Sequence, residues 1–245
     1  MSMKRNLSVS RPGRLVRAIA LSAVVGASMT ALPTQADPLV GVNQNLYEDG
    51  ALEQYLAEAE QGDIFSQYVL GHMYCNGKMV DQDYRKGMRW YRAAAEAGYA
   101  PSQLALGTMY YAGQGVEADE DQAVRWFQKA AKKGYARAQS NLAAIYLGGG
   151  SDYAKALHWY REAVLGGHQR SRYYLAMMYA RGLGMDAPDY IAAYALLDPL
   201  VRDGDESSAE LLAEFEDEMS ADELAEARAF AEGPQTRERM IAALD

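Results

Sequence analysis

The chain has 245 residues, of which 49% are hydrophobic and 23% are charged. These proportions belong to an ordinary globular protein and exclude disorder over most of its length. Its 33 acidic residues outnumber its 24 basic ones, and an acidic surface repels nucleic acid and anionic membranes. We therefore expect no nucleic acid among its partners.

The N-terminus has the pattern of a secretory signal peptide. Five basic residues precede an uncharged stretch at 18–32, and a small residue, Ala36, follows at the expected cleavage point. The basic residues are Lys4, Arg5, Arg11, Arg14 and Arg17. A transmembrane anchor is the alternative, but fewer than roughly 18 apolar residues make a short span. We expect residues 1–36 to be removed on export, to the periplasm or to the outside, and no direct insertion of the mature chain into a membrane.

Removing residues 1–36 takes away five of the 24 basic residues and no acidic one, so a net charge of −14 remains. Eleven of the acids lie between Asp203 and Glu226, where no basic residue interrupts them. Such runs are usually solvated helix faces, and the alternative is a docking surface for a basic partner. The single cysteine, Cys75, cannot form an internal disulfide. Cys75 is expected to be a small buried residue, and the alternative is that it forms an intermolecular disulfide bridge.

The middle of the chain is a repeat. The segment 98–134 aligns without a gap on 62–98, so that Gly62, Gly98 and Gly134 are spaced by one period, as are Leu70, Leu106 and Leu142. The next copy is shorter at Gly148-Gly149-Gly150, and a fourth copy ends near Gly204. The expected divisions are a linker at 37–50, a half repeat at 51–61, repeats at 62–97, 98–133, 134–166 and 167–203, and acidic capping helices at 204–245.

The sequence pattern predicts two helices in each unit. In the second unit, the first helix is predicted at 101–112, with Leu106 and Tyr110 on one face, and Gly113 and Gly115 turn the chain. The second helix is predicted to begin near Asp119 or Asp121, whose side chains can cap backbone N–H groups. Gly107 within the first helix indicates that another helix packs too closely for a Cβ atom. Tyr110, Trp126 and Phe127 are expected to fill the space between helices.

The recurring pattern resembles the Sel-one-like repeat (SLR) family, relatives of the tetratricopeptide repeats. It consists of Leu-Gly, Tyr, Gly-x-Gly-Val, Asp, Trp-Tyr or Trp-Phe, Ala-Ala and a final glycine, and it covers about 62–204. The resemblance implies an all-α, right-handed α/α superhelix whose concave surface binds other proteins. The fourth unit departs from the pattern, because Ala195-Leu196 replaces the aromatic pair and Asp198-Pro199 interrupts the expected end of the second helix.

The sequence contains none of the hydrolase and metal-enzyme motifs Ser-x-x-Lys, Gly-x-Ser-x-Gly, His-Glu-x-x-His and Cys-x-x-Cys. Gly113-Gln114-Gly115 and Gly182-Leu183-Gly184 follow helices, which does not suit a nucleotide fingerprint. The histidines, His72, His158 and His168, share no metal-binding spacing. The chain is therefore expected to be no enzyme and to need no cofactor or metal.

Positions that vary from unit to unit on the first helices are candidates for contact with a partner. Tyr173 and Tyr174, near Arg170 and Arg172, are residue types that favour binding hot spots. The alternative is that several of the varying residues only pack against the next unit. The predicted partner-binding residues are His72, Thr108, Asn141, Arg170, Tyr173, Tyr174 and Met177.

The leading hypothesis is a non-enzymatic scaffold or adaptor of the cell envelope that binds a protein or peptide. A partner that docks on the acidic region is expected to be basic. Two alternatives stay open. One is an envelope hydrolase acting on cell-wall or β-lactam-like substrates, which the resemblance suggests. The other is a permanent structural subunit of an envelope complex, docked through its acidic C-terminal region.

Overall fold

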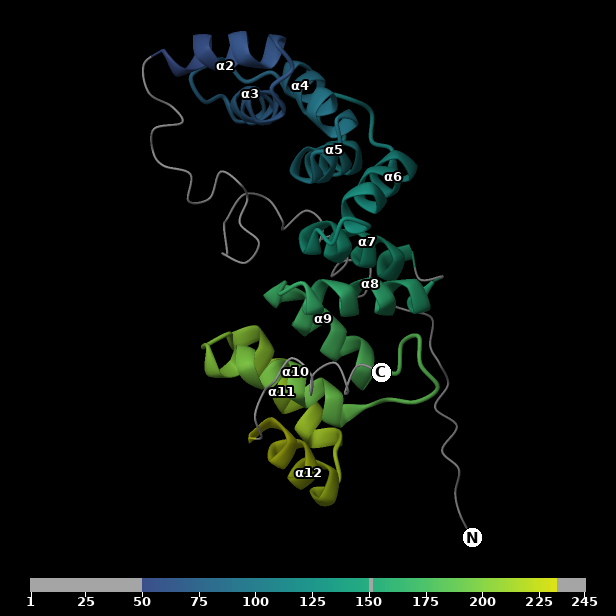
Figure 1. The fold of residues 1–245 in the computed structure, drawn as a ribbon. Coiled ribbons are helices and arrows are strands. Elements are labelled where there is room, and N and C mark those ends of the chain that lie inside the picture. The colour runs from purple at the N-terminus through teal and green to yellow at the C-terminus, as the bar shows by residue number, and fades with distance from the viewer. Residues whose placement is uncertain (1–49, 150–151, 233–245) are drawn as a thin grey trace.

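The computed structural model describes residues 50–149 and 152–232. The expected signal peptide at 1–36, the linker up to residue 49 and the last residues, 233–245, lie outside the described residues. The described ranges form eleven α-helices (Figure 1). They are α2 (Ala51–Glu60), α3 (Ile64–Asn76), α4 (Tyr84–Glu96), α5 (Ala100–Ala112), α6 (Glu120–Ala131), α7 (Ala136–Gly149), α8 (Tyr153–Leu165), α9 (Gln169–Ala180), α10 (Tyr190–Arg202), α11 (Glu206–Glu218) and α12 (Ala221–Glu232).

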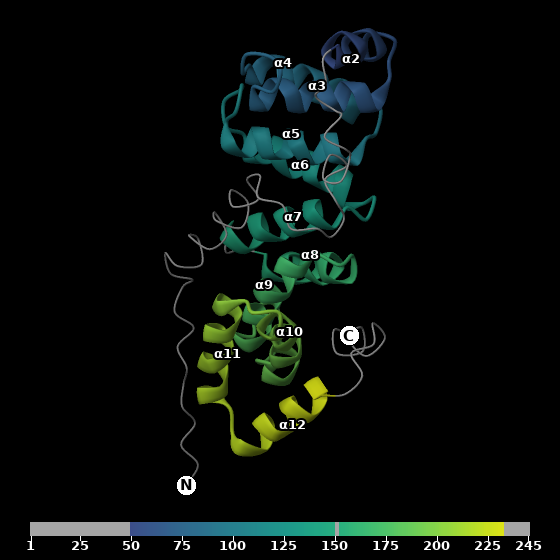
Figure 2. The ribbon, with the colours of Figure 1, turned by 90° about the vertical axis from the view of Figure 1, so that its left-hand side faces the viewer.

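The helices pack in chain order as helix-turn-helix units. The pairs α3–α4, α5–α6, α7–α8 and α9–α10 form the units, and each unit also contacts the next along the stack. Figures 1 and 2 show the resulting elongated array, from α2 at one end to α12 at the other. The predicted all-α repeat architecture is confirmed. We call α3, α5, α7 and α9 the first helices and α4, α6, α8 and α10 the second helices.

Local sequence chemistry explains where these helices begin and end. The second helices begin after an aspartate whose side chain accepts a hydrogen bond from a backbone N–H, as Asp119 does from Gln122 at 2.9 Å. The corresponding residues in the other units are Asp83, Asp152 and Asp189. Gly113 and Gly115 have φ angles of 69° and 75°, which glycine adopts readily. The predicted cap and turn are therefore confirmed.

In the first two units, a close contact between glycine and an aromatic ring holds the two helices together. A Cβ atom on Gly107 would lie 2.5 Å from ring carbons of Phe127, and one on Gly71 would lie 2.5 Å from the ring of Tyr91. Phe127 is fully buried. The interpretation of Gly107 as a site of close helix packing is therefore confirmed.

Two sets of hydrogen bonds join neighbouring units. A glutamine amide on the first helix donates to the last turn of the preceding second helix, as Gln103 Nε2 does to the Ala95 carbonyl at 3.0 Å. Gln67 and Gln139 repeat this bond. In addition, Arg92 donates to the Tyr110 hydroxyl at 2.7 Å, and Arg161 donates to Tyr179 at 2.8 Å. The stacking contact therefore recurs with the sequence period.

The fourth unit differs from expectation in two respects. Helix α10 continues through Pro199 to Arg202, so the proline does not end it. Proline removes one helical hydrogen bond, and the buried neighbours Leu197 and Leu200 anchor the last turns on the core. Counted from the cap residues Asp119 and Asp189, Leu196 and Leu197 take the places of Trp126 and Phe127, which corrects the expected pair Ala195-Leu196.

Cys75 is buried, with 8% of its surface exposed. A Cβ atom on Gly87 would lie 2.3 Å from its Sγ atom, so the thiol fills the space that this glycine leaves. Burial, helped by the charge of Asp83, raises the pKa of the thiol to about 12. Cys75 is therefore a packed neutral thiol, as expected of a small buried residue.

We predict that Gly107→Ala destabilises the protein. Alanine favours a helix over glycine by about 1 kcal/mol, but the added methyl group overpacks against Phe127, which costs about 1–3 kcal/mol. A net loss of up to about 2 kcal/mol is expected in urea unfolding. In the Phe127→Leu background the loss should be smaller, because leucine leaves room for the added methyl group, as Leu197 does beside Ala176 in the fourth unit. The third unit, which combines Ala143 with Tyr160, shows that the fold can also adjust to alanine beside a ring. Equal effects of Gly107→Ala in both backgrounds would contradict this account.

We also predict that His168 makes stability depend on pH. His168 precedes α9, and its Nδ1 lies 2.9 Å from Ser171 Oγ. Burial, with the nearby positive charges of Arg137 and Arg170, lowers its pKa from 6.5 to about 4. The unfolded chain therefore takes up this proton first, and stability falls as the pH drops from about 6.5 to about 4.

The matched variant is His168→Tyr, because Tyr99 and Tyr135 occupy the same position in the second and third units. Between pH 6.5 and pH 4 the free energy of unfolding of the native chain should fall by about 2–3 kcal/mol more than that of the variant. Urea titrations at several pH values measure this difference. Parallel pH profiles for the two proteins would show that His168 does not contribute.

Candidate partner-binding surfaces

Partly exposed side chains of the first helices form a surface that is interrupted on α7 and α9, where Ala144 and Met177 are buried. Phe65 and His72 on α3, like Pro101 and Thr108 on α5, are seven residues apart, about two helical turns, which keeps each pair on one side of its helix. We call this surface the first-helix face. It comprises Phe65, His72, Pro101, Thr108, Arg137, Arg170 and Arg181, with Tyr173 beside them, and each is at least partly exposed.

Four of the seven predicted binding residues reach this surface. Arg170 is exposed, and His72, Thr108 and Tyr173 are half-buried. The other three side chains lie in the interior, with exposed fractions of 5% for Asn141, 4% for Tyr174 and 1% for Met177. Partner binding by the four accessible residues stays a prediction, and the three buried ones can act only by supporting the surface.

Packing between helices explains why Tyr174 is buried. Its ring stacks on Tyr160 of α8 with centroids 5.5 Å apart, and Tyr173 meets it edge-on at 5.4 Å. Tyr160 is itself fully buried. The residue type at the Tyr174 position therefore follows the side chains that it packs against. This is the alternative stated above, in which varying residues only pack against another unit.

The α9 end of the first-helix face is rich in arginine. Arg137, Arg170 and Arg181 lie on it, and Arg172 stands where the first three units have the stacking glutamine. Burial lowers the pKa of the Arg172 guanidinium, against the opposing effect of Asp203. Tyr173 lies among these charges, and burial raises the pKa of its hydroxyl. This end therefore combines an aromatic ring with several cations and with two nearby carboxylates, Asp205 and Glu214.

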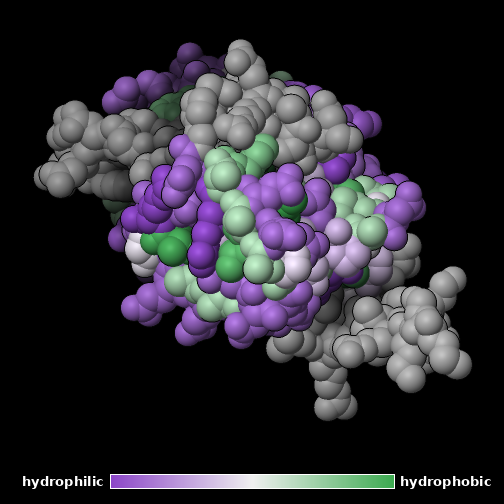
Figure 3. All heavy atoms as spheres, turned by 90° about the horizontal axis from the view of Figure 1, so that it is seen from below, coloured by the Kyte–Doolittle hydropathy of each residue, from purple (hydrophilic) through white to green (hydrophobic). Residues whose placement is uncertain are grey.

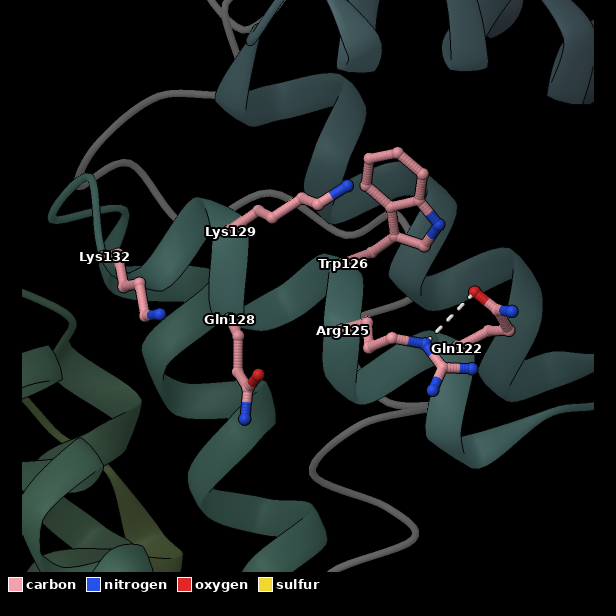
Figure 4. Close-up of a pocket in the computed structure, with 6 residues that line it drawn as sticks. All are labelled: Gln122, Arg125, Trp126, Gln128, Lys129 and Lys132. Atoms are coloured by element: carbon pink, nitrogen blue, oxygen red, sulfur yellow. Dashed lines mark hydrogen bonds between the residues drawn. The ribbon is translucent and has the colours of Figure 1, made fainter.

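A second candidate surface is a shallow groove of about 260 Å³ on α6 (Figure 4). Its lining carries three cations, Arg125, Lys129 and Lys132, and no carboxylate. Lys129 Nζ lies 3.7 Å from the centroid of the Trp126 ring, which is a favourable cation–π distance. Gln122 accepts a hydrogen bond from Arg125 Nε at 3.5 Å. We call this surface the α6 groove.

Sequence reasoning missed the α6 groove because it compared only the first helices. The same comparison made on the second helices would have found the groove, since Lys129 and Lys132 correspond to Ala93 and Glu96 in the first unit. In the third unit the corresponding residues are Glu162 and Leu165. Lys129 and Lys132 therefore distinguish the second unit from the first and the third, whereas Arg125 corresponds to Arg89 in the first unit.

Within residues 50–149 and 152–232, no three His, Cys, Asp or Glu side chains are grouped closely enough to hold a metal ion. The same ranges contain no helix with both the length and the apolar character needed to cross a bilayer. The three histidines lie apart, on α3, on α8 and before α9. The chemistry that these surfaces offer is charge, hydrogen bonding and aromatic contact.

Comparisons with known proteins agree with this architecture. Residues 64–99, 100–135, 136–168 and 169–204 each match the family model of the Sel1 repeat, and together they make up more than half of the chain. The crystal structure of a Sel1 repeat protein from Oxalobacter formigenes matches with a TM-score of 0.64 and 28% identity, over 69% of this chain and 72% of that one. None of the curated proteins matches.

A second solved structure is that of a protective antigen present in uropathogenic Escherichia coli strains, which displays an SLR fold. It matches with a TM-score of 0.67 and 29% identity, over 93% of this chain and 47% of that one. The chain thus spans about half the length of that antigen. Given four consecutive matching repeats and the observed stack of helix pairs, the chain belongs to the Sel1 repeat family.

Proposed function

We propose that the chain is a non-enzymatic interaction scaffold that binds a protein or peptide on the first-helix face. One observation carries this proposal. The residues that join units recur, such as Leu70, Leu106, Leu142 and Leu175, all of them fully buried. The exposed positions beside them do not recur, as Phe65, Pro101, Arg137 and Arg170 illustrate. Phe65 also packs on the buried cluster around Leu70, but the residue type at this position changes from unit to unit, so the exposed parts of these side chains are available for recognition.

The α9 end supplies the strongest anchor for a partner. Tyrosine and arginine are enriched among residues that dominate binding energy, and Tyr173 and Arg170 lie there together. Tyr173 packs edge-on against the buried Tyr174, so its ring is held in place before binding. A fixed ring loses little side-chain entropy when a partner covers it.

We further propose that the scaffold works outside the cytoplasm, in the periplasm. The basic and apolar pattern of residues 1–36 supports export. The envelope is then the compartment in which a partner should be sought.

Site-specific photocrosslinking tests the binding surface. A photoreactive residue at Thr108 or Arg170 on the first-helix face should capture one discrete partner in cells, whereas the same residue at Arg89 or His158, exposed on second helices, should not. The double substitution Arg170→Ala, Tyr173→Ala should weaken binding of the purified partner by about tenfold or more. The matched control Arg89→Ala, His158→Ala should leave the affinity unchanged. Partner adducts confined to the second-helix positions would contradict the assignment.

Export is tested by fusing residues 1–36 to alkaline phosphatase, whose disulfides form only in an oxidising compartment. The fusion should be enzymatically active in cells and should lose the first 36 residues. A control fusion of residues 37–72, which has the same length, should be inactive. An inactive fusion of residues 1–36 would place the protein in the cytoplasm.

A further inference from the structure

The α6 groove carries an ordered row of positive charge. Arg125, Lys129 and Lys132 follow one another at spacings of four and three, which places them on one side of α6. All three are exposed, and in the described ranges none forms an ion pair with a carboxylate. Neighbouring like charges on a helix repel one another. The row therefore destabilises its own helix slightly unless an anion covers it.

The row is not a requirement of the fold. The first unit has Ala93 and Glu96 where α6 has Lys129 and Lys132, and its helices stack in the same way. The adjacent Lys133 differs, because its Nζ donates to the Gly98 carbonyl and so ties two turns of the structure together. The contacts of the exposed row stay within α6, where Arg125 donates to Gln122 and Lys129 lies over Trp126.

Helix α11 carries the complementary row. Glu210, Glu214 and Asp217 are exposed and follow one another at the same spacings of four and three. Nearby carboxylates do have partners, since Arg228 pairs with Glu216 at 3.0 Å and Tyr190 donates to Glu218 at 2.6 Å. Among the described residues, no cation pairs with the three members of the row. Seen from the α12 end, the surface is mainly hydrophilic (Figure 3).

The two rows cannot meet within one copy. Helices α7 to α10 lie between α6 and α11 along the stack, as both ribbon views show (Figures 1 and 2). We propose that the α6 groove of one copy binds helix α11 of a second copy, with each cation of the first row facing a carboxylate of the second. The α6 groove lies on a second helix, apart from the first-helix face, whereas Glu214 of the α11 row lies near Tyr173 of that face. The association goes beyond the proposed scaffold function.

Trp126 supports this pairing in addition to the complementary charges. Its ring lies under Lys129, so that the ammonium group is held at the groove surface. A cation held in place loses less freedom when it pairs than a mobile lysine does. Gln122 and Gln128 flank the row and offer amide groups to the remaining carboxylate oxygens.

The net negative charge of the chain opposes association, but its reach is limited. At physiological ionic strength exposed charges farther apart than about 8 Å are largely screened, so the facing rows decide the local energy. The pairing joins two different surfaces, and it therefore either forms twice in a two-fold dimer or continues as a head-to-tail chain. Sedimentation velocity distinguishes these two forms.

The experiment is sedimentation of the purified full chain over a range of concentrations at about 0.1 M and about 1 M salt, where the Debye length falls from about 10 Å to about 3 Å. The groove variant is Lys129→Glu, Lys132→Glu, because neighbouring units already carry glutamate at these two positions, as Glu162 and Glu96. The row variant is Glu210→Lys, Glu214→Lys. The control Lys78→Glu, Arg85→Glu has the same charge change as the groove variant but lies outside both rows, at exposed sites.

We expect concentration-dependent association at low salt that weakens at least about tenfold at high salt and in either variant alone. The control should associate like the native chain. Mixing the two variants should restore association, because each supplies the surface that the other lacks. A chain that stays monomeric at low salt, or association that both variants leave unchanged, would overturn the proposal. Unaltered circular dichroism melting of the variants shows that they fold.

Discussion

The contact between a glycine on the first helix and a ring on the second sets the distance between the paired helices in the first two units. Gly71 meets Tyr91 and Gly107 meets Phe127, with no room for a further carbon atom. Alanine takes the place of this glycine in the third and fourth units, as Ala143 and Ala176, and the corresponding residues on the second helices are Tyr160 and Leu197. A small residue on the first helix is thus common to all four units, and close packing is reached with side chains of different size. Units of the same two-helix form can then stack with one repeated interface.

That repeated interface depends on a few polar groups at fixed places. The amides of Gln67, Gln103 and Gln139 reach the carbonyl groups at the end of the preceding unit. Buried carbonyl groups require such partners, and the bond therefore fixes the step from one unit to the next. In the fourth unit Arg172 stands at this position, and it brings positive charge to the α9 end. A change in a stacking residue thus alters the surface that a partner would meet.

Features that depend on local backbone chemistry were predicted correctly from the sequence. The period, the cap at Asp119 and the turn at Gly113 follow from preferences that act within a few residues. The candidate site was predicted less well, because variation between units was equated with exposure. Tyr174 varies and yet is buried, since Tyr160 of the neighbouring unit provides a matching ring. Helix α10 likewise passes Pro199 because packing on both sides outweighs one lost hydrogen bond.

The repeat fold does not determine which charged residues stand on the outer surfaces. Stacking requires neither the cations of the α6 groove nor the carboxylates of α11, since other units place different residues at corresponding sites. Each row repels itself, and a second copy relieves both at once. The α6 groove is separate from the first-helix face, but Glu214 of α11 lies near Tyr173 at the α9 end of that face. An associated pair would therefore keep the α3 and α5 parts of both faces available. Two linked binding faces hold a partner that has two sites more tightly than either does alone, and self-association would thereby strengthen a scaffold without any new contact to its partner.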